Sequence, residues 1–314
     1  DLPGRVTEST MINGPLIVGL GEVLWDMFPN RARFGGALAN YVCSVAGLGG
    51  NTVSVAMVTA VGVDPFGDHA VATLEKQGVD IRFIQRSQQP TGQVKVQIDG
   101  TGAATYDFAP DVAWDSLMWT EDLEALARRA DVVCFGTLAQ RSELSRRTIL
   151  HFLSCVRQTA TKVLDVNLRP PHYSLETVLH SLQMADVLKL NEEELPVIAT
   201  LCRCSGNHLD VLRQLVDRFD LKLVALTRGE RGSLLVRGSQ ISEFPGIPTE
   251  VMDTVGAGDA FTAAMTLGML RNQALSEMNE RASQVASYVC SQVGAAPDIP
   301  ARLAALFGGS PGFA

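Results

Sequence analysis

The sequence predicts an α/β protein with a mostly parallel central sheet, helices on both faces of that sheet, and a small second β-sheet. From residue 120 onward, short apolar runs alternate with segments of helical composition, a pattern typical of parallel strands joined by helices. Residues 92–108 instead alternate polar and apolar residues around turn signals, and with residues 23–34 they are expected to form the small sheet. A chain of 314 residues suffices for one large domain with such an addition.

The individual elements follow from apolar runs, helical periodicity and turn residues. In the first half we expect a strand from Leu16, a helix from Gly35, a strand over 53–58, a helix ending at Gln77, and short strands over 81–84, 92–98 and 104–108 that join 23–34 in a projecting sheet. In the second half we expect helices over 121–129, 142–159, 175–183, 192–200, 207–219 and 275–292, and strands over 132–135, 162–166, 187–190 and 223–227. Ligands of such sheets bind beyond the carboxyl ends of the strands, so polar residues that follow a strand are candidate site residues.

Composition and charge argue against several classes of function. The chain is 46% apolar and 19% charged, and its formal net charge of −8 argues against a nucleic-acid-binding surface. No apolar run is long enough to span a membrane, and six scattered cysteines fit reduced thiols in a cytoplasmic protein. Residues 1–14 are polar and predict a flexible N-terminal tail, the folded domain is placed at 15–308, and residues 309–314 are expected to be a C-terminal tail.

Residues 253–261, with the sequence DTVGAGDAF, predict a turn that runs into a helix. Gly256 and Gly258 let a ligand approach the main chain closely, and the free N–H groups and dipole of a helix N-terminus favour an anion such as phosphate. Asp259 is a carboxylate where an anion should bind, so we interpret it as a base that takes a proton from a nucleophile beside a phosphoryl group. The alternative is a tight turn with an acid in the first helical turn.

A second group of polar residues lies near the N-terminus. Asp26 follows the first strand, and Asn40 lies early in the helix that begins after Gly35 and Gly36. Carboxylates and amides pair well with vicinal hydroxyls because each offers several hydrogen-bonding sites. The alternatives are a solvated charge at a strand end and close helix packing.

Familiar nucleotide-binding loops are missing from the sequence. Leu24 stands where a dinucleotide-binding fingerprint needs glycine. The chain also lacks a GxxxxGK[ST] phosphate loop. A nucleotide would therefore be bound by a different kind of loop.

Three polar segments follow predicted strands in the second half. Arg169 could bind a carboxylate or phosphate, or form a surface ion pair with Asp165. Asn191 and Glu194 have the spacing of a helix cap with a capping box, and the same oxygens suit the hydrated shell of Mg²⁺. The sequence TRGERG at 227–232 predicts a tight turn.

These motifs together resemble the ribokinase-like (PfkB) sugar kinases over residues 16 to 300. The string from Asp253 to Thr266 resembles their C-terminal signature, Gly35 to Asn40 their N-terminal signature, and 191–194 and 227–232 their supporting motifs. The resemblance implies an ATP-dependent carbohydrate kinase with a β-sheet lid over the sugar. The implied roles are catalysis by Asp259 with Gly256, Ala257 and Gly258, sugar binding by Asp26, Gly35, Gly36, Asn40, Arg169 and Asp259, and nucleotide binding by Asn191, Thr227, Gly229, Gly232, Gly256 and Gly258.

The resemblance also implies cofactors, a substrate and a partner. Asn191 and Glu194 would organise Mg²⁺ through water, and Asp253 is implied in a site for a monovalent cation such as K⁺. The string NLRPP at 167–171 looks like that of fructokinases and favours fructose, phosphorylated at its 6-hydroxyl. Alternatives are 2-keto-3-deoxygluconate, whose carboxylate would suit Arg169, and ribose or a nucleoside. A homodimer through the lid is implied, and a catalytically silent sugar-binding protein is the alternative from another class.

Overall fold

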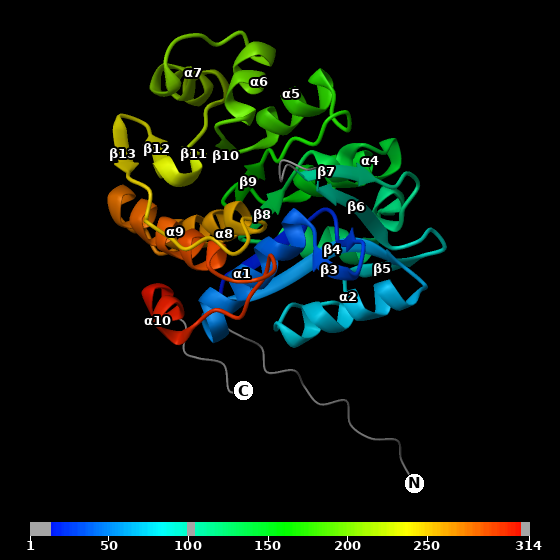
Figure 1. Cartoon of the computed structure of the whole chain (residues 1–314). Helices are drawn as coiled ribbons and strands as arrows, with labels where there is room; N and C mark the ends of the chain where they lie inside the picture. Colours follow the sequence, from blue (N-terminus) through cyan, green and yellow to red (C-terminus); the bar gives the residue numbers. More distant parts are fainter. Residues whose placement is uncertain (1–13, 99–103, 309–314) are drawn as a thin grey trace.

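The computed structural model describes residues 14–98 and 104–308, which are built around a nine-stranded sheet (Figure 1). The strand order is β13-β12-β11-β10-β9-β8-β1-β4-β5. The strands are β1 (Leu16–Leu20), β4 (Ser54–Gly62), β5 (Ile84–Ser87), β8 (Val132–Phe135), β9 (Thr161–Asp165), β10 (Val187–Asn191), β11 (Leu223–Thr227), β12 (Ser233–Arg237) and β13 (Gln240–Phe244). Neighbours from β5 to β11 pair in parallel, whereas β12 and β13 are antiparallel.

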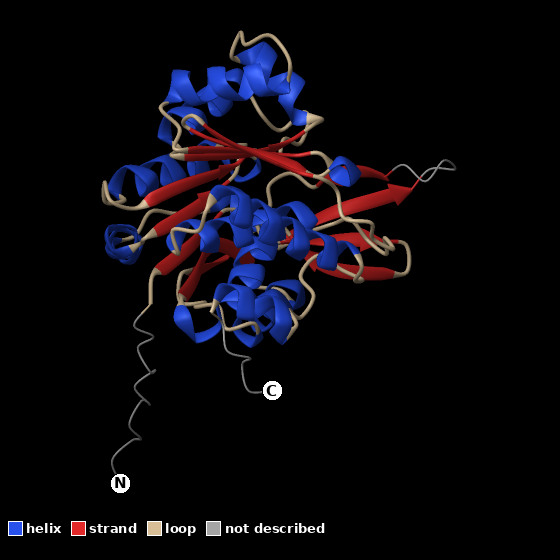
Figure 2. Cartoon of the chain, turned by 90° about the vertical axis from the view of Figure 1, so that its left-hand side faces the viewer, coloured by secondary structure: helices blue, strands red, loops and turns tan. Residues whose placement is uncertain are grey.

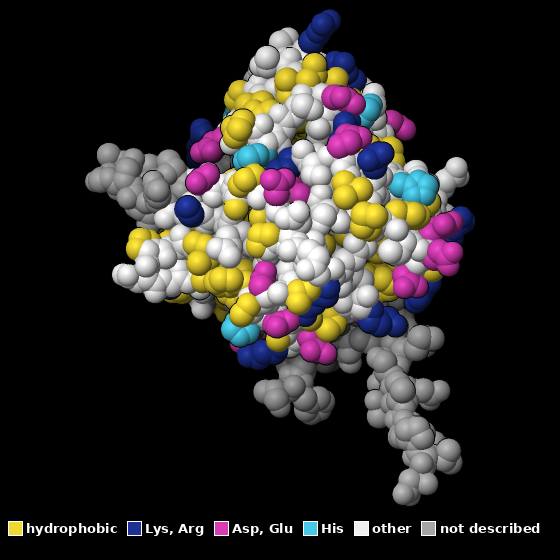
Figure 3. Space-filling view, turned by 90° about the vertical axis from the view of Figure 1, so that its right-hand side faces the viewer, with side chains coloured by type: hydrophobic (Ala, Val, Ile, Leu, Met, Phe, Trp, Pro, Cys, Tyr) yellow, Lys and Arg dark blue, Asp and Glu magenta, His cyan; other side chains and the backbone are white. Residues whose placement is uncertain are grey.

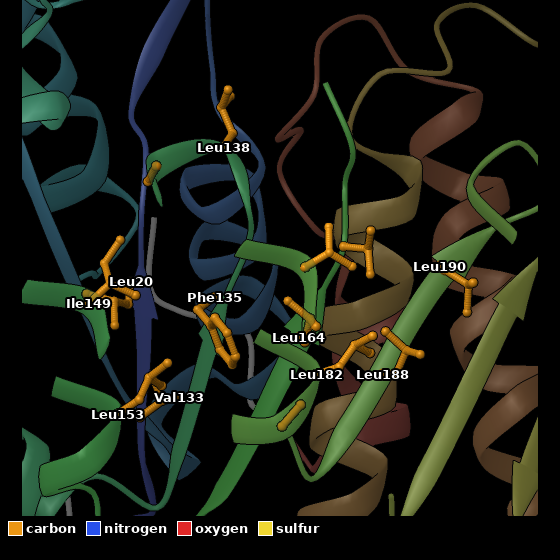
Figure 4. Close-up of a cluster of buried hydrophobic side chains, with 14 of the residues drawn as sticks. Leu20, Val133, Phe135, Leu138, Ile149, Leu153, Leu164, Leu182, Leu188 and Leu190 are labelled. Atoms are coloured by element: carbon orange, nitrogen blue, oxygen red, sulfur yellow. The ribbon is translucent and has the colours of Figure 1, made fainter. Parts of the chain in front are cut away.

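Helices cover both faces of this sheet, as predicted (Figure 2). One face packs against α1 (Ala37–Gly49), α2 (Pro65–Lys76), α8 (Ala257–Leu270) and α9 (Leu275–Cys290), and the other against α3 (Glu121–Arg129), α4 (Glu143–Cys155), α5 (Leu175–Met184), α6 (Glu194–Leu201) and α7 (His208–Phe219). Successive residues of a strand point to opposite faces, so Val163 of β9 belongs to one core and Leu164 to the other. Figure 4 shows part of the second core, where Leu164 and Leu188 lie near Leu182 of α5.

A separate four-stranded sheet forms from the two predicted lid segments. Its order is β3-β2-β6-β7, with β2 (Leu24–Phe28), β3 (Arg31–Gly35), β6 (Gly92–Ile98) and β7 (Ala104–Phe108). The strand expected at 81–84 is the exception. It lies at Ile84–Ser87 as β5 and pairs with β4 at the edge of the large sheet. The reason is that α2 returns the chain parallel to β4, which completes a βαβ unit.

Several predicted boundaries differ from the structure. The helix expected over 142–159 ends at Cys155, because Val156 has extended backbone angles (φ −64, ψ 134). The β12–β13 hairpin was not predicted, because only the turn before it was interpreted. A short helix, α10 (Ala301–Ala304), follows α9. Apart from Gly14, the predicted tails lie outside the described residues.

The surface carries mixed charges. On the face that Figure 3 shows, acidic, basic and apolar side chains are interspersed. In the described ranges, no helix is both long enough and apolar enough to cross a lipid bilayer.

The core packing predicts how two leucine truncations differ. Leu153 of α4 is 1% exposed, whereas Leu175 at the start of α5 is 50% exposed. Leu153→Ala should lower the free energy of unfolding by about 2–5 kcal/mol because it leaves a cavity in the core. Leu175→Ala should change it by no more than about 0.5 kcal/mol. Urea denaturation measures both, and equal costs would contradict the assigned packing.

Candidate active site

The candidate site lies where α8 begins, at the carboxyl ends of β9, β10 and β11 (Figure 1). Gly256 caps α8 with φ 82, and a Cβ there would lie 2.1 Å from the carbonyl oxygen of Ala295, so the turn requires glycine. A Cβ on Gly258 would lie 2.9 Å from Nζ of Lys189. The N–H of Ala257 donates to Thr254 O at 3.4 Å, and that of Ala260 donates to Gly256 O at 2.9 Å. The helix therefore begins with N–H groups that can face an anion.

Asp259 lies in the first turn of α8 and is held by the opposite helix. Nδ2 of Asn40, in the first turn of α1, donates a hydrogen bond to Oδ2 of Asp259 at 2.8 Å. Tyr41 and Thr266 make a second link between the two helices at 3.2 Å. The sequence predicted Asn40 as a sugar contact, and the structure adds that it orients the acid.

Burial raises the pKa of Asp259 to about 6, and the nearby charge of Asp165 contributes to the rise. Lys189, the hydrogen bond from Asn40 and Arg169 oppose it. Asp259 nevertheless remains partly exposed to solvent. A carboxylate of this kind is reachable by a ligand and is largely ionised at neutral pH, as a proton acceptor must be.

A buried ion pair between β9 and β10 holds the start of α8 in place. Nζ of Lys189, on β10, lies 3.2 Å from Oδ1 of Asp165 at the end of β9, and both side chains are at least nine-tenths buried. The hydroxyl of Thr262 donates to Oδ2 of Asp165 at 2.8 Å. Burial lowers the pKa of Lys189, but Asp165, Glu194 and Asp259 together hold it above its ordinary value. The alternative of an Arg169–Asp165 ion pair is therefore wrong, because Asp165 is committed to Lys189.

Lys189 was missed by the sequence interpretation. A lysine inside an otherwise apolar strand, in the sequence VLKLN, was the available signal. Lysine is almost never fully buried without a partner.

The predicted sugar-binding residues are connected to Asp259 through a hydrogen bond from Asn40 and through the charge of Arg169. Burial raises the pKa of Asp26, on β2, to about 6, and the guanidinium of Arg169 opposes the rise. The same guanidinium opposes the rise at Asp259, so Arg169 acts on both acids. Arg169 itself forms no ion pair with any described residue. Gly35 ends β3 beside Asp26, since a Cβ there would lie 3.1 Å from Oδ2 of Asp26, and Gly36 caps α1.

Glu22 is a second residue that the sequence interpretation did not identify. It is 1% exposed, and Oε1 accepts the N–H of Ala37 at the start of α1 at 3.2 Å. Burial raises the pKa of Glu22 to about 7, with a contribution from Asp259. Its position directly after the first strand was the available signal.

The predicted nucleotide-binding residues line one cavity of about 1000 Å³. Those on its wall are Asn191, Thr227, Gly229, Gly232 and Gly258, together with Ala257 and Lys189. Gly256 is the predicted member that does not line this cavity. Asp259 does not itself line this cavity, but Ala257 and Gly258, which directly precede it, do.

Asn191 and Glu194 form the predicted capping box. Oδ1 of Asn191 accepts the N–H groups of Glu193 and Glu194, each at 2.9 Å, and Oε2 of Glu194 accepts the N–H of Asn191 at 2.8 Å. Oε1 of Glu194 accepts the N–H of Leu168 at 2.8 Å. These oxygens therefore hold the loops after β9 and β10 together.

The ion pair predicts the effect of removing Lys189. Lys189→Met would leave Asp165 buried without a counter-charge, which should lower the free energy of unfolding by about 3–5 kcal/mol. Lys222→Met is the matched control, because Lys222 pairs with Asp186 at 3.0 Å but is 56% exposed, and exposed pairs contribute up to about 1 kcal/mol. Chemical denaturation of both variants checks this. A cost for Lys189→Met no larger than that of the control would contradict a structural role for the buried pair.

Comparison with known proteins agrees with this geometry. A model described as pfkB family carbohydrate kinase matches residues 23–302. A fructokinase from Salmonella typhimurium is 33% identical over 267 residues, which cover 81% of this chain and 84% of the relative. A solved uncharacterized sugar kinase from Pyrococcus horikoshii in complex with ATP is 26% identical, has a TM-score of 0.74, and covers 89% of this chain and 94% of its own.

A fructokinase from Xylella fastidiosa with bound ATP shares the fold, with a TM-score of 0.79 at 23% identity over 93% of this chain and 98% of its own. The family match spans most of the chain and includes the start of α1, the loops after β9, β10 and β11, and the turn into α8. This chain belongs to the pfkB family of carbohydrate kinases.

Proposed function

We propose that this protein is an ATP-dependent kinase that transfers the γ-phosphate to a primary hydroxyl of a monosaccharide, with fructose phosphorylated at O6. The observation that supports this most is the position of Asp259. Its carboxylate is bonded by Asn40, the preceding residues Ala257 and Gly258 line the cavity of about 1000 Å³, and the charge of Arg169 acts on both Asp259 and Asp26. An acid in this position can meet both a hydroxyl and a phosphoryl group.

The sugar is held by the polar cluster. Asp26 accepts hydrogen bonds from sugar hydroxyls, and the backbone at Gly35 and Gly36 lies beside them. Within the described part of the chain, Oδ1 of Asn40 is buried without a hydrogen-bond partner. A hydroxyl donated to this oxygen would satisfy it, while Nδ2 of the same side chain keeps Asp259 in place. Sugar binding and orientation of the base thus use one amide.

Asp259 takes the proton of the attacking hydroxyl, and the turn at Gly256, Ala257 and Gly258 stabilises charge on the transferred group. Phosphoryl transfer has a loose transition state, so correct placement and electrostatics account for most of the catalysis. Lys189 adds a fixed positive charge next to Gly258 on the cavity wall. The nucleotide lies along the loops that contain Asn191, Thr227, Gly229 and Gly232.

Magnesium accompanies the triphosphate. Mg²⁺ keeps several waters and binds phosphate oxygens in such sites. The side-chain oxygens of Asn191 and Glu194 accept hydrogen bonds from backbone N–H groups. These residues therefore fix the shape of the loop and contact the ion through bridging water.

The substrate choice rests on two features. The string NLRPP at 167–171 and the fructokinase relative favour fructose. The unpaired guanidinium of Arg169 near Asp26 would equally suit a carboxylate, which makes 2-keto-3-deoxygluconate the second candidate and ribose the third. A catalytically silent sugar-binding protein is disfavoured because the turn at 256–258 and the base are both in place.

We also propose a cytoplasmic homodimer. The outer strands of the lid sheet, β3 and β7, are edges that a second copy could extend. All six cysteines are free thiols, which fits a reducing compartment. Light scattering coupled to size-exclusion chromatography tests the dimer, and a monomer at all concentrations would exclude it.

The function is tested by a panel of sugars in a coupled ADP-release assay. Fructose should give the highest kcat/KM, with product phosphorylated at O6. Asp259→Asn should lower kcat by about 100-fold or more, because the proton acceptor is lost from the site. Asp210→Asn is the matched control, since Asp210 is also the third residue of a helix, α7, but does not line the cavity.

Three outcomes would change the proposal. Activity confined to the keto-acid would replace fructose. Near-normal turnover by Asp259→Asn would remove Asp259 from its role. Thermal stabilisation by a sugar without any ADP formation would favour the silent sugar-binding protein.

The raised pKa of Asp259 predicts the acid limb of the pH profile. The base must be ionised, so kcat/KM should fall by about tenfold per pH unit below the pKa of about 6 and level off above it. Asp26 also titrates near pH 6, so Asp26→Asn serves as the control. That variant should keep the limb at a higher KM, whereas the residual kcat of Asp259→Asn at saturating sugar should lack it. A limb that survives in Asp259→Asn would assign the titration to another group.

A further inference from the structure

The carboxylate of Asp253, three residues before Gly256, accepts three hydrogen bonds. One guanidinium nitrogen of Arg33 donates to Oδ2 in a short ion pair. Oδ2 also accepts the N–H of Gly294 at 3.3 Å, and Oδ1 accepts the N–H of Val255 at 3.1 Å. The side chain of Asp253 is 12% exposed and that of Arg33 is 21% exposed, so water screens the pair poorly.

This arrangement does not fit a monovalent cation at Asp253. Such an ion needs oxygen atoms with free lone pairs and a site of net negative charge. Here three donors point at the carboxylate, and one of them carries a full positive charge. A cation beside Asp253 would face the guanidinium of Arg33 at close range, where like charges repel.

Arg33 is positioned by the lid sheet. It lies on β3, directly opposite Asp26 of β2 in the antiparallel register. Its guanidinium carbon is 5.3 Å from the centre of the Phe28 ring, a favourable cation–π contact. Burial raises the pKa of Asp26, and the charge of Arg33 opposes this rise, less strongly than that of Arg169 does. The guanidinium is therefore held in place from the lid side as well as by Asp253.

We infer that Arg33 takes the charge-balancing place of a monovalent cation at Asp253, so that phosphoryl transfer by this protein does not depend on K⁺. The ion pair at the same time ties the lid to the segment that leads into the anion-binding turn. This inference rests on the proposed kinase function. It concerns the chain's own residues and makes Arg33 a positioning residue, since it acts through Asp253.

The test compares K⁺ with tetramethylammonium at constant ionic strength. For the wild-type enzyme, kcat and KM should agree between the two cations within about twofold, since ionic strength is held fixed. Arg33→Met should lower kcat by about 10- to 100-fold in tetramethylammonium, because the turn is no longer held in place. K⁺ should restore part of that loss, since the freed carboxylate can then bind the ion. Arg33→Lys, which keeps the charge, should remain indifferent to K⁺.

Arg31→Met is the matched control. Arg31 lies on the same strand and also faces the Phe28 ring, at 5.1 Å, but it is exposed. It should behave like the wild type in both salts. A loss of activity equal to that of Arg33→Met would indicate general damage to the lid and would overturn the assignment to the Asp253 ion pair.

A second readout does not need activity. The melting temperature of the wild type should be the same in K⁺ and tetramethylammonium, whereas that of Arg33→Met should rise in K⁺. Clear activation or specific stabilisation of the wild type by K⁺ would overturn the inference. Absence of sugar-dependent ADP formation in every salt would reject the proposed kinase function but not the inference about Arg33. The melting temperatures would still show whether K⁺ binds at Asp253.

Discussion

The position of the acid at the entrance of α8 depends on one buried ion pair, between Lys189 and Asp165. Burying two charges costs free energy that their attraction recovers only with good geometry and additional hydrogen bonds. Here the hydroxyl of Thr262 supplies one such bond to Asp165 at 2.8 Å and thereby ties α8 to the end of β9. Thr262 lies one turn after Asp259, on the same helix. The pair therefore determines where the first turn of α8 lies on the edge of the sheet, and we attribute its presence to this positioning rather than to stability.

The opposite side of α8 is held by α1, and this contact connects Asp259, the proposed base, to the four-stranded sheet, the proposed lid. Asn40 bonds Asp259, and α1 begins directly after Gly35, the last residue of lid strand β3. The same strand contains Arg33, which pairs with Asp253 just ahead of the anion-binding turn. A displacement of the lid would therefore act on the acid through α1 and on the turn through Asp253. For a kinase this coupling is useful, because a base and a phosphate site that assemble only with the lid in place disfavour transfer to water.

The sequence sufficed for the architecture and for most of the site because both are encoded locally. Strand and helix periodicity, glycine turns and polar residues at strand ends predicted the parallel sheet, the lid segments and Asp259. Partnerships across the fold were beyond such patterns. Arg33 and Asp253 are 220 residues apart, and Lys189 looked like one residue of an apolar strand until β9 placed Asp165 beside it. The strand expected at 81–84 was assigned to the wrong sheet for the same reason, since local alternation does not specify which edge a strand joins.

The raised pKa values reveal a site with more buried acids than nearby positive charge. Burial raises the pKa of Asp26 and of Asp259 to about 6 and that of Glu22 to about 7, although Arg169 lowers each of them. Hydrogen bonds donated to a carboxylate favour its ionised form. A sugar that donates hydroxyls to Asp26 and Asp259 would therefore lower both pKa values. Asn40 keeps the acid aligned at the same time. In this arrangement the substrate would complete the electrostatic environment of Asp259 and keep its carboxylate ionised while the hydroxyl to be phosphorylated is in place.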